Sequence, residues 1–259
     1  MAKNDFLESI KKAAEDRENV LKKKGLISAY VAETRDESGI DPRIIAYHNP
    51  KSSIVESYRA IFTHLRPSLE KSNIKTITVI SASNQEGKSI TAVNLSVVMA
   101  KDFEKEILLI DANLRNSAID ELLNIEAREG LSDVLSKSLD YNNALVSTKI
   151  ENLKVMTAGA NTVNPVELLS NQRMTQFLNQ AKQKFDYIVL DTPAIIPYAD
   201  SKILVSLADG AILTIRARKT RREIIDRTQS ILDKLDAKIL GFVLTGIEYY
   251  IPEFIYKHL

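Results

Sequence analysis

Six short apolar runs, rich in β-branched residues and separated by stretches with helical spacing, limit what this chain of 259 residues can fold into. The runs are continuously apolar, as expected for strands that are covered on both faces of a sheet. Strands that alternate with helices favour an α/β fold with a doubly wound, mostly parallel sheet and helices on both faces. The strands are expected at residues 77–82, 106–111, 153–158, 187–192, 210–216 and 239–247.

Between these runs, apolar residues recur at the spacing of a helix. Because a parallel strand pair needs a crossover connection, each of these stretches is a candidate crossover helix. A further helix is expected before the first strand. The expected helices are at residues 53–70, 89–102, 131–145, 165–184, 199–207 and 221–235.

The sequence predicts a three-part organisation: an N-terminal helix and linker at 1–50, a main domain at 51–247 and a tail at 248–259. A weak amphipathic pattern predicts a helix at 5–24. The segment 26–50 contains Gly, Pro and mixed charge, which is typical of a linker or of a strap lying on the main domain.

The charge and composition of the chain exclude several classes of function. Lys and Arg number 35 against 34 Asp and Glu, so the net charge of +1 gives no general case for nucleic acid as a partner. The absence of cysteine excludes disulfides and thiolate metal sites. The charged N-terminus and the lack of an apolar run of about 18 residues or more predict a cytoplasmic protein. Recruitment to the inner face of the membrane would then need a partner.

The run A-S-N-Q-E-G-K-S at residues 82–89 lies between a predicted strand and a predicted helix, which is the context that a phosphate-binding loop requires. Backbone N–H groups at the helix N-terminus would hold the phosphates of ATP, and Gly87 would let the main chain approach closely. Lys88 would reach the β- and γ-phosphate oxygens, and the Ser89 hydroxyl would bind Mg²⁺. The alternative is a chance match on a surface turn. The residues expected to bind nucleotide are Asn84, Gln85, Glu86, Gly87, Lys88, Ser89 and Ile90.

Two aspartates end predicted strands, at the edge of the sheet where ligands of open α/β folds bind. Asp191 is expected to be the Walker B carboxylate that contacts Mg²⁺. Asp111 is expected to hold the metal or to accept a proton from an incoming hydroxyl. Either could instead cap a helix. The predicted metal ligands are thus Ser89, Asp111 and Asp191, and the predicted catalytic residues are Lys88, Asp111 and Asp191.

The motifs SASNQEGKSITAVNLS, ILLIDANLR and YIVLDTPAIIPYAD resemble, in order and spacing, those of the bacterial tyrosine kinases (BY-kinases) that control capsule and exopolysaccharide synthesis. The segment VESYRAIFTHLR resembles the oligomerisation helix of that family. The resemblance runs from about residue 44 to 250. MinD and ParA type ATPases carry an extra signature lysine where this chain has Ser83, which favours the kinase branch.

The resemblance implies a protein tyrosine autokinase that uses ATP and Mg²⁺. It implies that tail tyrosines, here Tyr249, Tyr250 and Tyr256, are phosphorylated largely between neighbours in a ring, with Glu56 and Arg59 in the oligomerisation helix. It further implies activation by a membrane-spanning polysaccharide co-polymerase (Wzz-like) and a cognate tyrosine phosphatase.

The chain departs from the family pattern at Asn113, at Phe62 and in the small number of its tail tyrosines. Asn113 stands where the second motif usually carries a second aspartate, and an amide contributes no negative charge. Phe62 stands where a second arginine of the oligomerisation helix is common. Two other functions therefore stay open: an ATP-binding, pseudokinase-like scaffold of the same machinery, and a MinD or ParA type ATPase.

Two further segments have open interpretations. The tail tyrosines could simply pack on the domain through their apolar neighbours. A basic cluster lies at the loop edge of the sheet and either is a solvated face or contacts nucleotide, a neighbour's tail or anionic lipid. This cluster consists of Arg216, Arg218, Lys219, Arg221 and Arg222.

Overall fold

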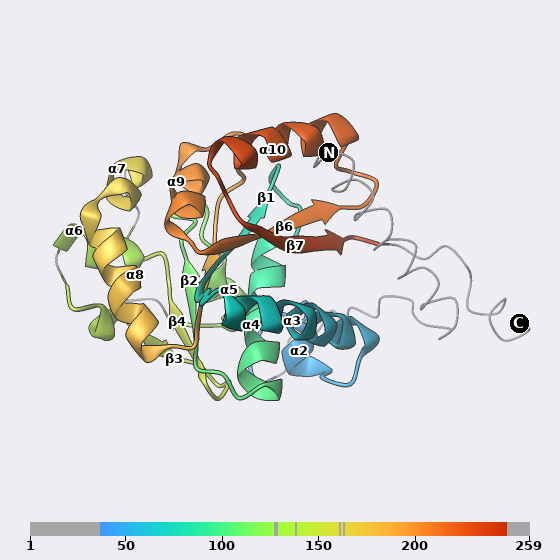
Figure 1. Cartoon of the computed structure of the whole chain (residues 1–259). Coiled ribbons are helices and arrows are strands. Elements are labelled where there is room, and N and C mark those ends of the chain that lie inside the picture. The colour runs from blue at the N-terminus through green and yellow to red at the C-terminus, as the bar shows by residue number, and fades with distance from the viewer. Residues whose placement is uncertain (1–36, 127–128, 138, 161, 163, 248–259) are drawn as a thin grey trace, which may run out of the picture. The chain divides into compact units, whose positions relative to one another are not determined.

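The computed structural model describes residues 37–126, 129–137, 139–160, 162 and 164–247 (Figure 1). The predicted helix at 5–24 and the tail with Tyr249, Tyr250 and Tyr256 lie outside the described residues. Within the described part of the chain, no helix is long and apolar enough to cross a membrane.

A seven-stranded sheet forms the centre of the domain, in the order β3-β4-β2-β5-β1-β6-β7. All neighbouring strands are parallel except β3 and β4. The predicted fold class and the six predicted strands are confirmed. The short edge strand β3 was not predicted, because two residues are too few to show a periodic pattern. The strands are β1 Thr76–Ser81, β2 Ile107–Asp111, β3 Val146–Ser147, β4 Leu153–Met156, β5 Tyr187–Asp191, β6 Gly210–Arg216 and β7 Ile239–Thr245.

The helices cover both faces of the sheet. Two predicted helices are each divided in the structure. The one expected at 165–184 is interrupted at Asn171, whose side chain accepts a hydrogen bond from the Arg173 N–H and so begins a new helix. The one expected at 131–145 is an α-helix followed by a 3-10 turn. The elements are α2 Ile45–His48, α3 Ser53–Lys71, α4 Lys88–Asp102, α5 Ile119–Leu123, α6 Leu131–Lys137, η1 Tyr141–Ala144, α7 Pro165–Ser170, α8 Gln172–Lys184, α9 Ala199–Leu207 and α10 Arg222–Lys234.

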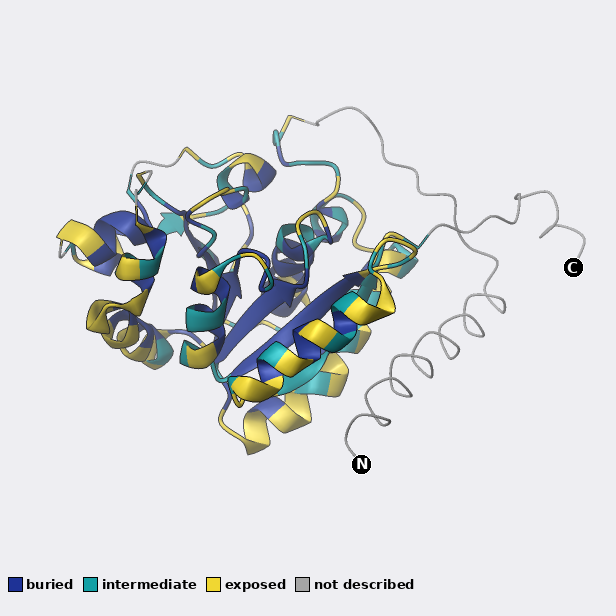
Figure 2. Ribbon diagram, turned by 90° about the horizontal axis from the view of Figure 1, so that it is seen from above, coloured by how far each residue is buried: buried dark blue, intermediate teal, exposed yellow. Residues whose placement is uncertain are grey.

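The hydrophobic core has two parts, one on each face of the sheet (Figure 2). Successive residues of a strand point to opposite faces, so Leu109 lies in the part beneath α3 and α4, whereas Leu108 and Ile110 lie in the part beneath α6 to α9. Helix α4 is buried along most of its length. This burial explains why it is apolar on nearly every side.

The segment that precedes α3 packs into the first part of the core. Ile40, Ile44 and Ala46 are buried there. The buried side chain of Asn94 on α4 clamps this segment: its Oδ1 accepts from the Ala46 N–H at 2.9 Å, and its Nδ2 donates to the Arg43 carbonyl at 3.1 Å. Residues 40–46 are therefore an integral part of the packed domain.

The two residues assigned to oligomerisation lie on α3 and interact within the chain. Arg59 donates to Glu56 Oε1 at 2.6 Å and to Asp102 Oδ2 at 2.7 Å. Asp102 ends α4, which begins at the phosphate-binding loop, so Arg59 lies about 20 Å along that helix from the loop. Glu56 stays largely exposed. A role of Glu56 and Arg59 in self-association stays a prediction.

Candidate active site

The three sequence motifs meet at one edge of the sheet. Strand β5 lies between β1 and β2, so the loops that follow these three strands are neighbours. Asp111, the last residue of β2, is directly opposite Asp191, the last residue of β5. Asp191 in turn pairs with Val79 of β1, which leads into the phosphate-binding loop. The expectation that both aspartates share one edge with this loop is therefore confirmed.

The loop 82–89 turns into α4 at Gly87, which caps the helix in the left-handed conformation with φ +87°. A Cβ at this position would lie 3.1 Å from Thr245 Cγ2, so both the backbone conformation and the contact with β7 favour glycine. Gln85 also has a positive φ, of 62°. These two turns place the loop at the N-terminus of a long helix, where backbone N–H groups bind anions.

Glu86 braces the phosphate-binding loop from within. Its side chain is only 1% exposed, although it is a carboxylate. Its Oε2 accepts from the Ser83 N–H at 3.1 Å, and its Oε1 accepts from the Thr220 hydroxyl at 2.6 Å. The Thr245 hydroxyl donates to its carbonyl at 2.8 Å. Since the carboxylate is used inside the loop, a contribution of Glu86 to nucleotide binding would come from its main chain.

Part of the basic cluster borders this loop. Arg216 Nη1 donates to the Gln85 carbonyl at 2.9 Å, and Lys219 Nζ lies 3.5 Å from Gln85 Oε1. The side of the loop toward β6 and β7 is thus positively charged. Arg218, Arg221 and Arg222 are exposed.

Ser89 and Asp191 form the clearest candidate for a metal site. The Ser89 hydroxyl donates to Asp191 Oδ2 at 2.5 Å. Asp191 is fully buried, and its Oδ1 has no hydrogen-bond partner among the described residues. A buried carboxylate oxygen without a partner is costly, and Mg²⁺ prefers carboxylate and hydroxyl oxygens. These residues therefore fit a Mg²⁺ ion.

Asp111 is buried beside them and grips the loop that follows it. Its Oδ1 accepts from the Asn113 N–H at 3.1 Å. Its Oδ2 accepts from the N–H groups of Ala118 and Ile119, at 2.9 and 3.0 Å. Asp111 thus holds the N-terminus of α5, much as a helix-capping residue would. It also lies beside Asp191, as a second metal ligand or a proton acceptor should.

Burial changes the acidity of the three charged groups of the site. Burial and the nearby charge of Asp191 raise the pKa of Asp111 to about 7. Burial also raises the pKa of Asp191 to about 6, against the lowering effects of the Ser89 hydroxyl and the Lys88 ammonium. Burial lowers the pKa of Lys88, while Asp191 and Glu86 oppose that change. Two carboxylates and one ammonium with little access to water are typical of a functional site.

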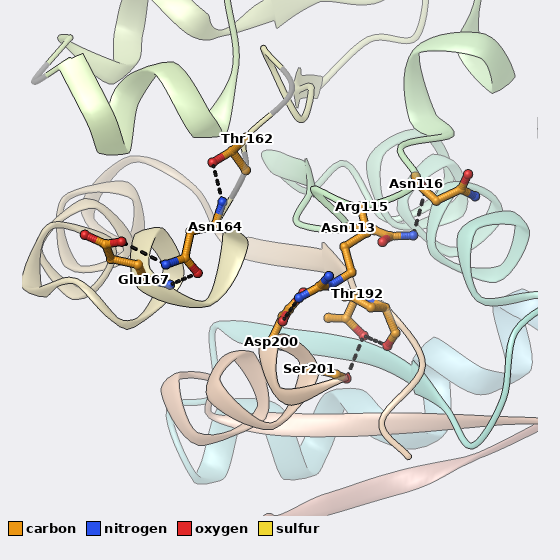
Figure 3. A network of polar contacts seen from close by, with 10 residues as sticks. Asn113, Arg115, Asn116, Thr162, Asn164, Glu167, Thr192, Asp200 and Ser201 are labelled. Atoms are coloured by element: carbon orange, nitrogen blue, oxygen red, sulfur yellow. Dashed lines mark hydrogen bonds and ion pairs between the residues drawn. The ribbon is translucent and has the colours of Figure 1, made fainter. Parts of the chain in front are cut away.

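Asn113 lies in the loop between β2 and α5, where its amide Nδ2 donates to the Asn116 carbonyl at 2.7 Å (Figure 3). A carboxylate at this position could not make this bond, because it has no proton to donate. The amide thus replaces the charge of an aspartate with a bond inside the loop.

Sequence reasoning did not single out Thr220, Thr245, Arg115 or Asp200, all of which contact the motifs. The two threonines hold Glu86 from more than 130 positions away along the chain. Arg115 and Asp200 form an ion pair between the second and third motifs. Arg115 ends the second motif and Asp200 ends the third. Their opposite charges were the signal in the sequence from which an ion pair could have been predicted.

Comparisons with known proteins agree with this geometry. A family model described as an AAA domain matches residues 74–239. The chain is 35% identical over 209 residues to the tyrosine-protein kinase YwqD of Bacillus subtilis (strain 168), which covers 81% of this chain and 88% of the relative. The kinase domain of the Escherichia coli tyrosine kinase ETK superposes with a TM-score of 0.81 at 25% identity, over 87% of this chain and 89% of that one.

A more distant neighbour shows the same fold. The septum site-determining protein MinD from Pyrococcus horikoshii OT3, solved with Mg-ADP, has a TM-score of 0.59 at 23% identity and covers 71% of this chain and 76% of that one. With a family model over most of the domain and a close curated relative, the family expected from the three motifs is confirmed: this chain belongs to the AAA-domain family of P-loop proteins and, within it, to the bacterial tyrosine kinases.

Proposed function

We propose that this chain is an ATP-dependent tyrosine autokinase that regulates the polymerisation or export of capsule or exopolysaccharide. The observation that supports this most is the buried cluster of Ser89, Asp191 and Asp111 next to the phosphate-binding loop. Phosphoryl transfer needs mainly positioning and charge stabilisation, so few groups are required. Tail tyrosines of a neighbouring copy, Tyr249, Tyr250 and Tyr256, are the proposed acceptors.

Each residue of the site has a proposed task. Backbone N–H groups of residues 84–90 bind the phosphates, and Lys88 stabilises charge on the transferred group. Ser89 and Asp191 hold Mg²⁺, which would supply positive charge against the phosphate oxygens. Asp111 orients the acceptor hydroxyl and takes its proton. A pKa near 7 suits a proton acceptor that works at neutral pH.

A labelling experiment tests the proposal. The purified full chain is incubated with labelled ATP and Mg²⁺, alone and with the cytoplasmic part of a membrane-spanning co-polymerase as activator. We expect label on the tail tyrosines, located by mass spectrometry, and none in Lys88→Met, which keeps an unbranched side chain in the same buried position. If wild type stays without phosphotyrosine in both samples, the kinase proposal fails.

The recruitment of the protein belongs to the same proposal. We expect the chain to reach the inner face of the membrane by binding the co-polymerase, to form a ring with other copies, and to be reset by a tyrosine phosphatase. Added phosphate brings about −1.5 to −2 charge per tyrosine. That charge would repel a tail from a site that already holds ATP phosphates.

A pseudokinase-like scaffold is the second candidate, and Asn113 favours it. In a MinD or ParA type ATPase, the third candidate, a lysine would stand at Ser83. The hydroxymethyl side chain of Ser83 carries no ammonium group that could reach a phosphate. Hydrolysis of ATP without phosphotyrosine would support that third function.

Asn113→Asp separates the kinase from the scaffold. The change removes the bond to the Asn116 carbonyl and adds a carboxylate two residues from Asp111, whose Oδ1 accepts from the main-chain N–H of the same residue. Because the number of charged ligands tunes metal affinity, we expect autophosphorylation to rise about tenfold at limiting Mg²⁺. The rate of phosphotyrosine formation is measured across a Mg²⁺ titration.

Asn116→Asp is the matched control, since it adds the same charge to the same loop at an exposed position. An equal gain in both variants would mean a general effect of charge. No gain in Asn113→Asp would favour the scaffold.

A further inference from the structure

An ion pair joins the loops that follow the two aspartates. Arg115, in the loop between β2 and α5, donates from Nε to Asp200 Oδ2 at 2.5 Å and from Nη2 to Asp200 Oδ1 at 3.0 Å. Asp200 lies in the first turn of α9, at the end of the segment that follows β5. Figure 3 shows the two side chains meeting between these segments. The guanidinium also lies over the Tyr198 ring, 5.1 Å from its centre.

The pair is built so that neither side chain is easily replaced. Asp200 is fully buried, whereas the Arg115 side chain is 38% exposed. A buried carboxylate requires a partner, and a bidentate guanidinium fixes its orientation as well as its charge. Lysine carries the same charge but cannot form this planar fork.

Both ends of the pair lead directly to the site. The loop that carries Arg115 follows Asp111, and the N–H groups of its last residue, Ala118, and of the first residue of α5, Ile119, donate to Asp111 Oδ2. Both ends of the loop thus meet at Asp111, whose carboxylate the loop holds in place. A shift of Arg115 would be transmitted to the orientation of Asp111.

The segment before Asp200 is anchored next to Asp191, through the residue that follows it. Thr192, the next residue after Asp191, donates its hydroxyl to the Val79 carbonyl at 3.0 Å. The Ser201 hydroxyl lies 3.5 Å from that of Thr192 (Figure 3). The first turn of α9 is thus fixed against β1 and β5. Within the described part of the chain, no hydrogen bond or ion pair joins Arg115 or Asp200 to the phosphate-binding loop.

We propose that Arg115 and Asp200 are positioning residues that set Asp111 against Asp191 for transfer to the acceptor hydroxyl. This inference rests on the proposed kinase function. It assigns the pair to the acceptor side of the site, so its loss impairs the transfer step and leaves ATP binding intact. A misplacement of about 1 Å at a reacting group lowers a rate by about 100-fold.

The test uses the full chain with Arg115→Ala and Arg115→Lys. We expect kcat of autophosphorylation to fall about 10- to 100-fold in both, with the KM for ATP unchanged within about twofold. Millimolar guanidinium chloride should restore much of the activity of Arg115→Ala, because the ion can enter the space beside Asp200. It should not restore Arg115→Lys, where the lysine side chain occupies that space.

Lys137→Ala is the matched control. Lys137 pairs at 2.7 Å with Asp133, another nearly buried carboxylate, on α6 and away from both loops. This variant should lose some stability, as Arg115→Ala does, without a change in kcat. A similar loss of kcat in Lys137→Ala, or equal responses of both Arg115 variants to guanidinium, would overturn the positioning role.

A second measurement needs no nucleotide. Hydrogen exchange of the Ala118 and Ile119 amides reports directly on their bonds to Asp111, and we expect it to be at least tenfold faster in Arg115→Ala than in wild type or Lys137→Ala. Unchanged exchange would overturn the inference. If wild type itself forms no phosphotyrosine, the proposed function fails, and the exchange rates alone decide whether the pair positions Asp111.

Discussion

Asp191→Asn is expected to abolish tyrosine phosphorylation and, at the same time, to make the nucleotide-free protein more stable at pH 8. The loss of activity follows because the amide removes the charge that would hold Mg²⁺ beside Ser89 and leaves a weaker ligand. We expect the rate to fall about 1000-fold, because Asp191 would hold the ion that stabilises charge on the transferred phosphoryl group. Phosphotyrosine formation at saturating ATP measures this effect.

The gain in stability comes from removing the buried negative charge of Asp191. Burial raises the pKa of Asp191 to about 6, whereas an aspartate in an unfolded chain has a pKa of about 3.9. The folded protein therefore binds this proton more tightly. Its stability falls as the pH rises between these two values, and the loss is complete above about pH 7. Asparagine has no charge to bury and also relieves the repulsion that raises the pKa of Asp111.

Thermal unfolding at two pH values measures this second effect. We expect the melting temperature of Asp191→Asn to exceed that of wild type by several degrees at pH 8, which corresponds to about 2 kcal/mol. The difference should largely disappear near pH 4, where the wild-type carboxyl is protonated in the folded state. Saturating Mg²⁺ and ATP should raise the melting temperature of wild type but not that of Asp191→Asn. A variant that is less stable than wild type at pH 8 would contradict the assignment of Asp191 as a strained, buried charge.

The sequence was sufficient for the main features of the fold because those features depend on periodicity. Continuous apolar runs locate the buried parallel strands, and the aspartates that end two of them lie at one edge by the geometry of a parallel sheet. The break at Asn171 was missed because a cap residue between two helical patterns leaves the apolar spacing nearly unchanged. The helices α2 and α5 are too short to show a period.

Contacts between distant segments explain what the sequence could not predict at the site. Glu86 was expected to bind nucleotide, yet its carboxylate bonds Thr220, which no local pattern connects with the loop. Arg115 and Asp200 each lie in a quoted motif, but their pairing depends on how two loops approach one another. The sequence identified the groups that do the chemistry. Three-dimensional packing decides which residues hold them.

Phe62 shows how a departure from a family pattern can have a structural cause. An arginine, the residue expected here from the family pattern, carries a charge that needs water or a partner, whereas Phe62 is 1% exposed. Its ring meets Phe103 edge-on at 4.7 Å between centroids and Tyr187 at 5.6 Å. It therefore joins α3 to the end of α4 and to β5. Phe62 is therefore not expected to take part in self-association, and a role of Glu56 and Arg59 in it stays a prediction.

Phe62→Arg is accordingly expected to destabilise the fold by about 4 kcal/mol or more, because it removes a buried aromatic ring and places an unpaired charge in the core. Urea unfolding followed by circular dichroism measures the change. Thr63→Arg, at the adjacent exposed position, is the matched control and should stay within about 0.5 kcal/mol of wild type. If Phe62→Arg instead folds normally and forms larger oligomers in size-exclusion chromatography, position 62 belongs to the subunit interface. That result would contradict the explanation that a phenylalanine stands at position 62 because it packs against Phe103 and Tyr187.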